Sequence, residues 1–228
     1  MAVPERGRNV EGLAVSGRFV VLEGIDGSGK TTQLERLSQW LPRSGLLPAG
    51  AAVVVSREPG GTPLGQALRQ LLLPPPEAAP SGTSELLLYA ADRAQHVDTV
   101  IRPALERGDW VLCDRFTGST AAYQGDGRGL PLEWIRQLEQ LATGGLEADL
   151  TIWLDLPLGA AQRRRQARQP DRIEASGEAF QERVAAGFAR LALERGWSRV
   201  AADQAPAQVS AAIQELLRTR WPAAAPHG

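Results

Sequence analysis

The chain contains few residues of several kinds, and each shortage excludes a class of protein. Its 228 residues include one cysteine, Cys113, so no internal disulfide can form. That argues against a small disulfide-bonded secreted scaffold and favours a reducing compartment. No apolar run approaches the roughly 18 residues of a membrane-spanning helix, and residues 1–12 hold no apolar signal-peptide core. We therefore expect a cytoplasmic protein that has no membrane partner.

Positively and negatively charged residues are almost equal in number. Lys and Arg together number 25 and Asp and Glu 26, which gives a formal net charge of −1 and a pI of about 6.2. A chain that is not basic overall has no general attraction for polyanions, so we expect no nucleic-acid partner. Lysine itself is almost missing, because Lys30 is the single lysine and the rest of the basic count is arginine.

The spacing of apolar runs predicts the fold. Residues 1–16 are polar and aperiodic, so we predict a flexible tail there and a single domain over residues 17–220. Short apolar runs alternate with helical patterns, which predicts an α/β fold with a five-stranded parallel sheet flanked by helices on both faces. The runs predicted as strands cover residues 18–23, 51–55, 109–114, 150–155 and 198–201.

A glycine-rich segment follows the first predicted strand. Gly24-Ile-Asp-Gly-Ser-Gly-Lys-Thr31 fits the pattern G-x-x-x-x-G-K-[ST] and precedes a helical pattern. In such a loop the backbone N–H groups and the helix N-terminus surround phosphates, and the lysine reaches the outer ones. A flexible loop with one surface lysine is the alternative. The segment predicts a nucleoside triphosphate site made of Gly24, Ile25, Asp26, Gly27, Ser28, Gly29, Lys30, Thr31 and Thr32.

The third predicted strand ends in Asp114, which parallel topology places at the same sheet edge as the glycine-rich loop. The Thr31 hydroxyl and the Asp114 carboxylate are oxygen ligands of the kind that Mg²⁺ prefers. An ordinary helix-capping aspartate is the alternative for Asp114. We predict that Thr31 and Asp114 hold Mg²⁺ together with ATP.

Arginines follow two other predicted strands. Arg57 and Arg115 come after strands two and three, and Arg93 lies on the intervening helix. A guanine-reading Asn-Lys-x-Asp segment cannot exist, because Lys30 is already in the phosphate loop, so a GTPase switch is excluded. Converging guanidinium groups would form a second anion site, as a kinase with a phosphorylated acceptor needs. Each arginine alone can equally be a solvated surface residue.

Several motifs in this order resemble the thymidylate kinases, particularly their bacterial branch, from about Phe19 to Leu217. They are the phosphate loop, Arg57-Glu-Pro-Gly-Gly-Thr62, Tyr89-Ala-Ala-Asp-Arg93, Asp114-Arg-Phe116, Ala122-Tyr-Gln-Gly-Asp-Gly-Arg-Gly129 and Asp171-Arg-Ile-Glu174. The resemblance implies a P-loop nucleoside monophosphate kinase-like fold. It also implies the reaction ATP + dTMP to ADP + dTDP, and a homodimer.

The resemblance further implies roles for residues at the matching positions. Arg57 and Arg115 would grip the acceptor phosphate, and Asp26 would approach the deoxyribose 3′-hydroxyl. Tyr89 would stack on thymine, where relatives commonly carry Phe, or would be a core aromatic without a ligand. Arg93 would read the thymine carbonyl edge. The complete set implied to bind dTMP is Asp26, Arg57, Tyr89, Arg93, Arg115, Ser119, Thr120, Tyr123 and Gln124, with Tyr123 crowding the position of a ribose 2′-hydroxyl.

Residues 158–174 hold a cluster of arginines, namely Arg163, Arg164, Arg165, Arg168 and Arg172. A solvated helix face, a nucleic-acid patch and a lid over the phosphates are all compatible with such a cluster. The resemblance favours the lid, because family members with glycine at the Gly27 position present an arginine from this segment. We predict catalytic roles for Lys30, Arg57, Arg115, Arg164 and Arg168, with Arg168 favoured as the contact to the transferred phosphoryl group.

Two other functions fit part of the sequence. A deoxynucleoside kinase would need a base, for which Glu58 is a candidate, although we expect Glu58 to buttress Arg57. Another nucleoside monophosphate kinase, or a non-catalytic P-loop module, would share the phosphate loop. For the homodimer, Leu86–Leu88 with Val97, Val100 and Ile101 offers an apolar face, which core packing explains as readily.

Overall fold

The computed structural model describes residues 17–73, 79–165, 172–173 and 175–222. The predicted tail, residues 1–16, lies outside this part of the chain. So do Arg168 and most of the second half of the predicted lid.

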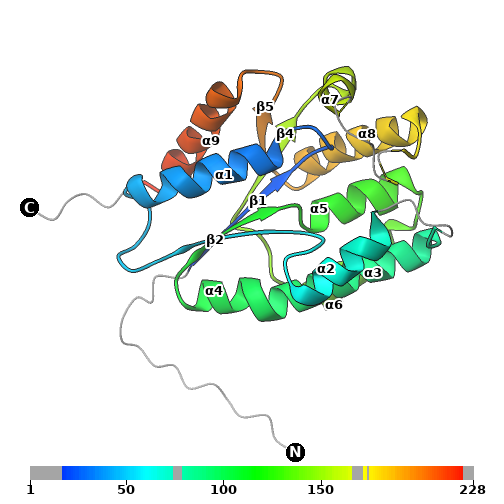
Figure 1. Ribbon diagram of the computed structural model, residues 1–228, viewed down its shortest axis with the longest axis horizontal. Coiled ribbons are helices and arrows are strands. Elements are labelled where there is room, and N and C mark those ends of the chain that lie inside the picture. Colours follow the sequence, from blue (N-terminus) through cyan, green and yellow to red (C-terminus); the bar gives the residue numbers. More distant parts are fainter. Residues whose placement is uncertain (1–16, 74–78, 166–171, 174, 223–228) are drawn as a thin grey trace, which may run out of the picture.

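One five-stranded sheet forms the centre of the described structure (Figure 1). Its strands lie in the order β2-β3-β1-β4-β5, and all neighbouring pairs are parallel. The strands are β1 (Arg18–Glu23), β2 (Val53–Arg57), β3 (Trp110–Asp114), β4 (Leu150–Asp155) and β5 (Ser198–Ala201). The predicted parallel sheet is confirmed, and β2 differs from the prediction by starting and ending two residues later.

The central strand β1 explains why the sequence there is a continuous apolar run. Phe19 and Val21 point to one face of the sheet, where they pack with Val97 and Ile101. Val20 and Leu22 point to the other face, toward Leu34 and Leu37 of the first helix. All four strand side chains are at most 1% exposed. A strand covered on both faces needs apolar residues at every position, rather than at alternate ones.

Helices cover both faces of the sheet. In Figure 1, α1 and α9 lie along one face, and α2, α3, α4 and α6 lie on the opposite side. The helices are α1 (Lys30–Trp40), α2 (Pro63–Leu72), α3 (Gly82–His96), α4 (Arg102–Glu106), α5 (Thr117–Thr120), α6 (Leu132–Thr143), α7 (Leu158–Arg165), α8 (Glu178–Glu194) and α9 (Pro206–Arg220). Two π-helical segments, η2 (Val97–Ile101) and η3 (Ala121–Gly127), and a 3₁₀ turn, η1 (Leu41–Arg43), complete the described helical structure.

Local sequence sets where several helices begin. Ser81 caps α3, since its hydroxyl accepts a hydrogen bond from the Ser84 amide at 3.2 Å. Thr62 caps α2 in the same way, with Pro63 in the first turn. The described part of the chain contains no helix long and apolar enough to cross a bilayer.

Core packing takes up much of the apolar face considered for a homodimer. Leu86, Val97 and Ile101 are at most 1% exposed, so they are not available to a partner. Leu87, in contrast, is 52% exposed.

Truncating a buried leucine of α1 tests this description of the core. We expect Leu37→Ala to lower the free energy of unfolding by about 2–5 kcal/mol, because Leu37 is fully buried and its loss leaves a cavity. Leu193→Ala on α8 is the matched control, since Leu193 is 88% exposed, and its effect should stay within about 0.5 kcal/mol. Urea unfolding followed by circular dichroism measures both, and equal effects would contradict the assignment of the core.

Candidate active site

The loop between β1 and α1 turns sharply enough to surround an anion. Gly24, Gly27 and Gly29 all have positive φ, at 142°, 87° and 96°, which glycine adopts without strain. The Lys30 side chain folds back over the loop and donates to the carbonyl oxygens of Gly24 at 2.9 Å and Ile25 at 3.1 Å. Burial lowers the pKa of Lys30, and the nearby Arg115 adds to this effect. The loop therefore holds the Lys30 ammonium group close to the position where phosphates would lie.

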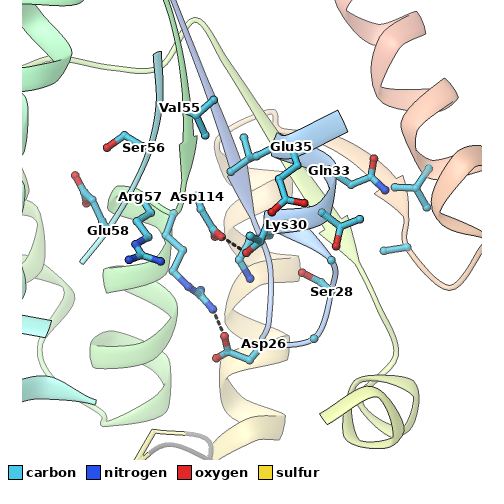
Figure 2. A pocket seen from close by; sticks show the side chains of 18 of the residues that line it. Asp26, Ser28, Lys30, Gln33, Glu35, Val55, Ser56, Arg57, Glu58 and Asp114 are labelled. Atoms are coloured by element: carbon cyan, nitrogen blue, oxygen red, sulfur yellow. Dashed lines mark hydrogen bonds and ion pairs between the residues drawn. The ribbon is translucent and has the colours of Figure 1, made fainter. Parts of the chain in front are cut away.

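A cavity of about 920 Å³ opens beside this loop (Figure 2). Every predicted ATP-binding residue from Asp26 to Thr32 lines it, whereas Gly24 and Ile25 contribute the carbonyls that bind Lys30. Arg57 and Arg115 line the same cavity from the ends of β2 and β3. The two arginines expected to grip an acceptor phosphate thus share one concavity with the phosphate loop.

Thr31 and Asp114 meet at the cavity, as predicted from their positions in the sequence. The Thr31 hydroxyl donates to Asp114 Oδ2 at 2.9 Å. Asp114 Oδ1 is buried and has no hydrogen-bond partner among the described residues. An unsatisfied carboxylate oxygen beside a threonine hydroxyl is a donor set that suits Mg²⁺, which prefers hard oxygen ligands.

Arg115 and Asp26 form an ion pair between the phosphate loop and the end of β3. Arg115 Nη2 donates to Asp26 Oδ1 at 2.6 Å, and the Tyr123 hydroxyl donates to Asp26 Oδ2 at 2.9 Å. Burial by itself disfavours the Asp26 carboxylate, but Arg115 and Lys30 outweigh it and hold the pKa of Asp26 well below its usual range. The pair is therefore charged at neutral pH.

A smaller cavity, of about 80 Å³, adjoins the large one. Asp26 and Arg115 line both cavities, as do Glu58 and Arg69, so these four residues form the shared wall. Arg57 lines only the larger one. The other residues implied to bind the acceptor all line the smaller cavity, namely Tyr89, Arg93, Ser119, Thr120, Tyr123 and Gln124.

Arg93 is buried at the smaller cavity and is held by three acceptors. It donates to Glu58 Oε2 at 2.8 Å, to the Phe116 carbonyl at 2.9 Å and to Thr120 Oγ1 at 2.9 Å. The expectation that Glu58 buttresses Arg57 is wrong. Successive side chains of an extended segment point to opposite sides, so Glu58 turns inward to 4% exposure while Arg57 stays exposed.

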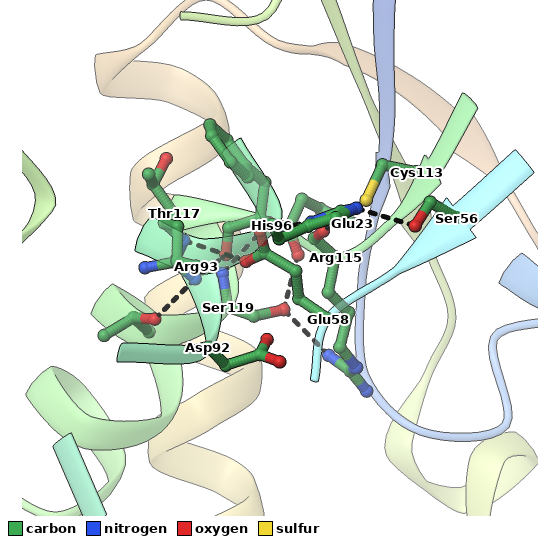
Figure 3. A network of polar contacts seen from close by, with 12 residues as sticks. Glu23, Ser56, Glu58, Asp92, Arg93, His96, Cys113, Arg115, Thr117 and Ser119 are labelled. Atoms are coloured by element: carbon green, nitrogen blue, oxygen red, sulfur yellow. Dashed lines mark hydrogen bonds and ion pairs between the residues drawn. The ribbon is translucent and has the colours of Figure 1, made fainter. Parts of the chain in front are cut away.

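The network around Glu58 includes three residues to which no sequence motif assigns a role, Ser56, Asp92 and His96 (Figure 3). His96 Nδ1 lies 2.9 Å from Glu58 Oε1, and His96 Nε2 lies 2.6 Å from the Ser56 hydroxyl. Asp92 Oδ1 accepts a hydrogen bond from the Gly60 amide at 3.1 Å. Asp92 and His96 lie four residues apart on α3, so helical spacing was the signal that could have linked them.

Glu85 binds one residue that lines the smaller cavity, Gln124, and one residue of the predicted lid, Arg172. Gln124 donates to Glu85 Oε1 at 2.7 Å, and Arg172 donates to Glu85 Oε2 at 2.5 Å. Glu85 is fully buried on α3. Arg172 of the predicted lid is therefore bound to the same carboxylate as Gln124, a predicted acceptor residue.

The first half of the predicted lid packs on the phosphate loop. Arg164 donates to the carbonyls of Gly27 at 3.3 Å and Ala202 at 2.8 Å, and it lines the larger cavity. A Cβ atom at Gly27 would come within 3.1 Å of the Ala161 carbonyl oxygen on α7. Glycine at this position thus permits the close approach of α7. Arg168 lies outside the described residues.

Comparison with known proteins identifies the family. The family model for thymidylate kinase matches residues 22–213. The chain belongs to the thymidylate kinase family. It is 61% identical over 205 residues to the thymidylate kinase of Synechococcus sp. strain CC9605, covering 90% of this chain and 98% of that protein. The thymidylate kinase of Synechococcus sp. strain CC9311 is 63% identical over 205 residues, covering 90% and 97%.

A solved structure of the same family has a similar fold. The crystal structure of thymidylate kinase from Ehrlichia chaffeensis matches with a TM-score of 0.70 at 32% identity, over 89% of this chain and 99% of that one. The P-loop nucleoside monophosphate kinase-like fold is thereby confirmed.

The Asp92 carboxyl group makes the stability of the folded chain depend on pH. Burial, followed by the charge of Glu58, raises the pKa of Asp92 to about 6, while the hydrogen bond from the Gly60 amide and the charges of His96 and Arg93 act in the opposite direction. The folded chain therefore binds this proton more tightly than the unfolded chain. The stabilisation that comes from binding this proton at Asp92 is complete below the pKa of about 4 that an aspartate has in the unfolded chain. It is lost as the pH rises through 6.

We therefore expect the difference in Tm between Asp92→Asn and the unmodified chain to shift in favour of the variant as the pH is raised from 5 to 7.5. The asparagine keeps the acceptor for Gly60 but cannot ionise. Differential scanning calorimetry at both pH values measures the change, and Asp98→Asn on the exposed side of η2 is the control. A difference in Tm that does not depend on pH would contradict the assignment.

Proposed function

We propose that the chain transfers the γ-phosphoryl group of ATP to dTMP, forming ADP and dTDP. The observation that carries this proposal is the pair of adjoining cavities. One lies beside the phosphate loop, the other is lined by all the implied acceptor residues except Arg57, and Arg115 and Asp26 line both. Membership of the thymidylate kinase family supports the same reaction.

On the donor side, the loop amides and Lys30 bind the ATP phosphates. Lys30 exchanges its present carbonyl acceptors for phosphate oxygens, which carry more negative charge. Thr31 and Asp114 would hold Mg²⁺, which would supply positive charge to neutralise the phosphates of ATP. Arg164 of α7, already at the loop, contributes a further guanidinium group from the predicted lid.

On the acceptor side, Arg57 and Arg115 bind the dTMP phosphate from the ends of the neighbouring strands β2 and β3. Asp26 receives the deoxyribose 3′-hydroxyl, and Tyr123, hydrogen-bonded to Asp26, fills the space that a ribose 2′-hydroxyl would occupy. A ribonucleotide is then disfavoured by contact with a fixed ring.

The thymine base enters the smaller cavity. Tyr89 stacks on its face, and Arg93 donates to its carbonyl edge. Ser119 and Thr120 line the same wall, and Gln124 lies near the base or sugar. Because Glu58, Phe116 and Thr120 hold Arg93 rigidly, the guanidinium group is oriented before the nucleotide arrives.

The chemistry requires no protein base. The acceptor is a phosphate monoester whose second pKa is about 6, so its attacking oxygen is already ionised at neutral pH. Catalysis then consists of holding two polyanions in line and reducing their repulsion. Glu58, the candidate base of a deoxynucleoside kinase, is buried and already bound to Arg93 and His96, which argues against that alternative.

Acceptor preference tests this function directly. We expect ATP-dependent ADP formation with dTMP and no comparable rate with thymidine, because thymidine lacks the phosphate that Arg57 and Arg115 bind. Lys30→Ala should lower turnover with dTMP by about a hundredfold or more, since it removes a donor to the transferring group. A coupled ADP assay measures all of these rates.

Two results of that assay would overturn the proposal. Faster phosphorylation of thymidine than of dTMP would identify a nucleoside kinase. Binding of ATP without any acceptor-dependent ADP formation would identify a non-catalytic P-loop module. Other nucleoside monophosphates serve as controls for base selectivity.

We also propose that the chain forms a homodimer through α2, α3 and α6, which pack side by side on one side of the sheet (Figure 1). Large apolar side chains on these helices remain exposed. They are Leu64, Leu71, Leu87, Trp134 and Leu141, at 47%, 59%, 52%, 49% and 79%. A set of exposed apolar side chains on adjacent helices is typical of a protein interface.

A charged substitution in this set should dissociate the dimer. We expect Leu87→Glu and Leu141→Glu to sediment as monomers, because each would bury an unpaired carboxylate at the interface. Leu193→Glu, on α8 outside the set, is the matched control and should remain dimeric. Analytical ultracentrifugation measures the mass, and a dimer in all three variants would rule out this interface.

A further inference from the structure

Glu23, the last residue of β1, has a buried carboxylate that the reaction itself does not use. Its side chain is 1% exposed and accepts three hydrogen bonds. Oε1 accepts from the amides of Phe116 at 2.9 Å and Ser119 at 3.0 Å, and Oε2 accepts from the Ser119 hydroxyl at 2.6 Å. All three donors belong to the turn that follows Arg115 (Figure 3).

These donors include two amides at the start of α5. Phe116, the residue before this helix, offers no side-chain cap. Glu23 supplies the missing acceptor from a different strand, 93 residues earlier in the chain. Gly118 lies against the same carboxylate, since a Cβ atom there would come within 2.9 Å of Glu23 Oε1. The carboxylate therefore fixes the backbone of the turn directly.

Arg115 depends on this turn for its conformation. It is the one non-glycine residue with positive φ in the described chain, at 72°. Side chains rarely adopt this region, and such a residue persists only where its surroundings hold it. Its guanidinium Nη1 donates to the Ser119 hydroxyl at 2.9 Å, the same hydroxyl that donates to Glu23. Ser119 thus links the two charged side chains.

We propose that Glu23 is a positioning residue that holds the Arg115 guanidinium in place for the acceptor phosphate. The link runs through the amides of Phe116 and Ser119 and through the Ser119 hydroxyl. This inference rests on the proposed role of Arg115 in binding dTMP. Without the carboxylate, the turn loses its acceptor and Arg115 loses one of the partners that aim it at the shared wall of the two cavities.

Burial of the Glu23 carboxyl group disfavours its charged form. Burial raises its pKa, although Ser119, Arg115 and the backbone amides oppose that effect. The folded chain therefore binds this proton more tightly than the unfolded chain does. Glu23→Gln removes the charge that burial disfavours and keeps one acceptor oxygen, so we expect little change in thermal stability.

A double-mutant cycle tests the proposal in the full-length chain. We expect Glu23→Gln to lower kcat/KM for dTMP by about ten- to a hundredfold, because small misplacements of a binding group are costly. KM for ATP should change by less than about twofold and Tm should not fall. In an Arg115→Lys background, Glu23→Gln should cause a further loss of less than about twofold, since its effect passes through Arg115.

Additional variants exclude a general effect of substituting a buried carboxylate. Asp109→Asn is the matched control, because Asp109 is 7% exposed and accepts from the Ala52 amide at 2.9 Å at the other end of the sheet. Its kinetics should be unchanged. Ser119→Ala removes only the hydroxyl link, and its loss should be less than additive with that of Glu23→Gln.

Independent losses in the Glu23→Gln and Arg115→Lys variants would overturn the positioning role, as would full activity of Glu23→Gln. If the unmodified chain does not phosphorylate dTMP, the proposed function fails separately. A crystal structure of Glu23→Gln then decides the inference, with Arg115 expected to leave Ser119 and Asp26. An unmoved Arg115 would reject it. The same structure decides the question if kinetics cannot be measured.

Discussion

The ion pair between Arg115 and Asp26 is the contact on which the site depends. Asp26 belongs to the phosphate loop after β1, and Arg115 follows the neighbouring strand β3. Parallel strands bring their carboxyl ends to one edge, so residues 89 positions apart in sequence form a contact of 2.6 Å. The pair lines both the cavity beside the loop and the smaller cavity.

Buried carboxylates orient the arginines around this pair. Glu58 holds Arg93, and Glu23 acts on Arg115 through Ser119. Arginine suits such an arrangement, because its planar group can bind a protein carboxylate on one side and present donors on another. Preorganised cations are effective for phosphoryl transfer, since they need not rearrange as charge develops. The low exposure of these groups is therefore part of how the site works.

Local patterns predicted much of this structure. β1, β4 and β5 have the predicted bounds, because strands buried in a parallel sheet appear as continuous apolar runs. The phosphate loop was predictable because its glycines and lysine act within eight consecutive residues. The partners of Glu58 were not, since they depend on α3 packing beside the end of β2. For Glu23 the sequence indicates only the end of a strand, because the residues that donate hydrogen bonds to it lie far along the chain.

The single lysine has a practical consequence. All other long cationic side chains are guanidinium groups, which do not react with acylating reagents under conditions that modify amines. Lys30 lines the cavity beside the loop, and burial lowers the pKa of its ammonium group. Apart from a terminal amine, one acyl group per chain would therefore mark the phosphate loop itself, and a nucleotide seated there would protect it.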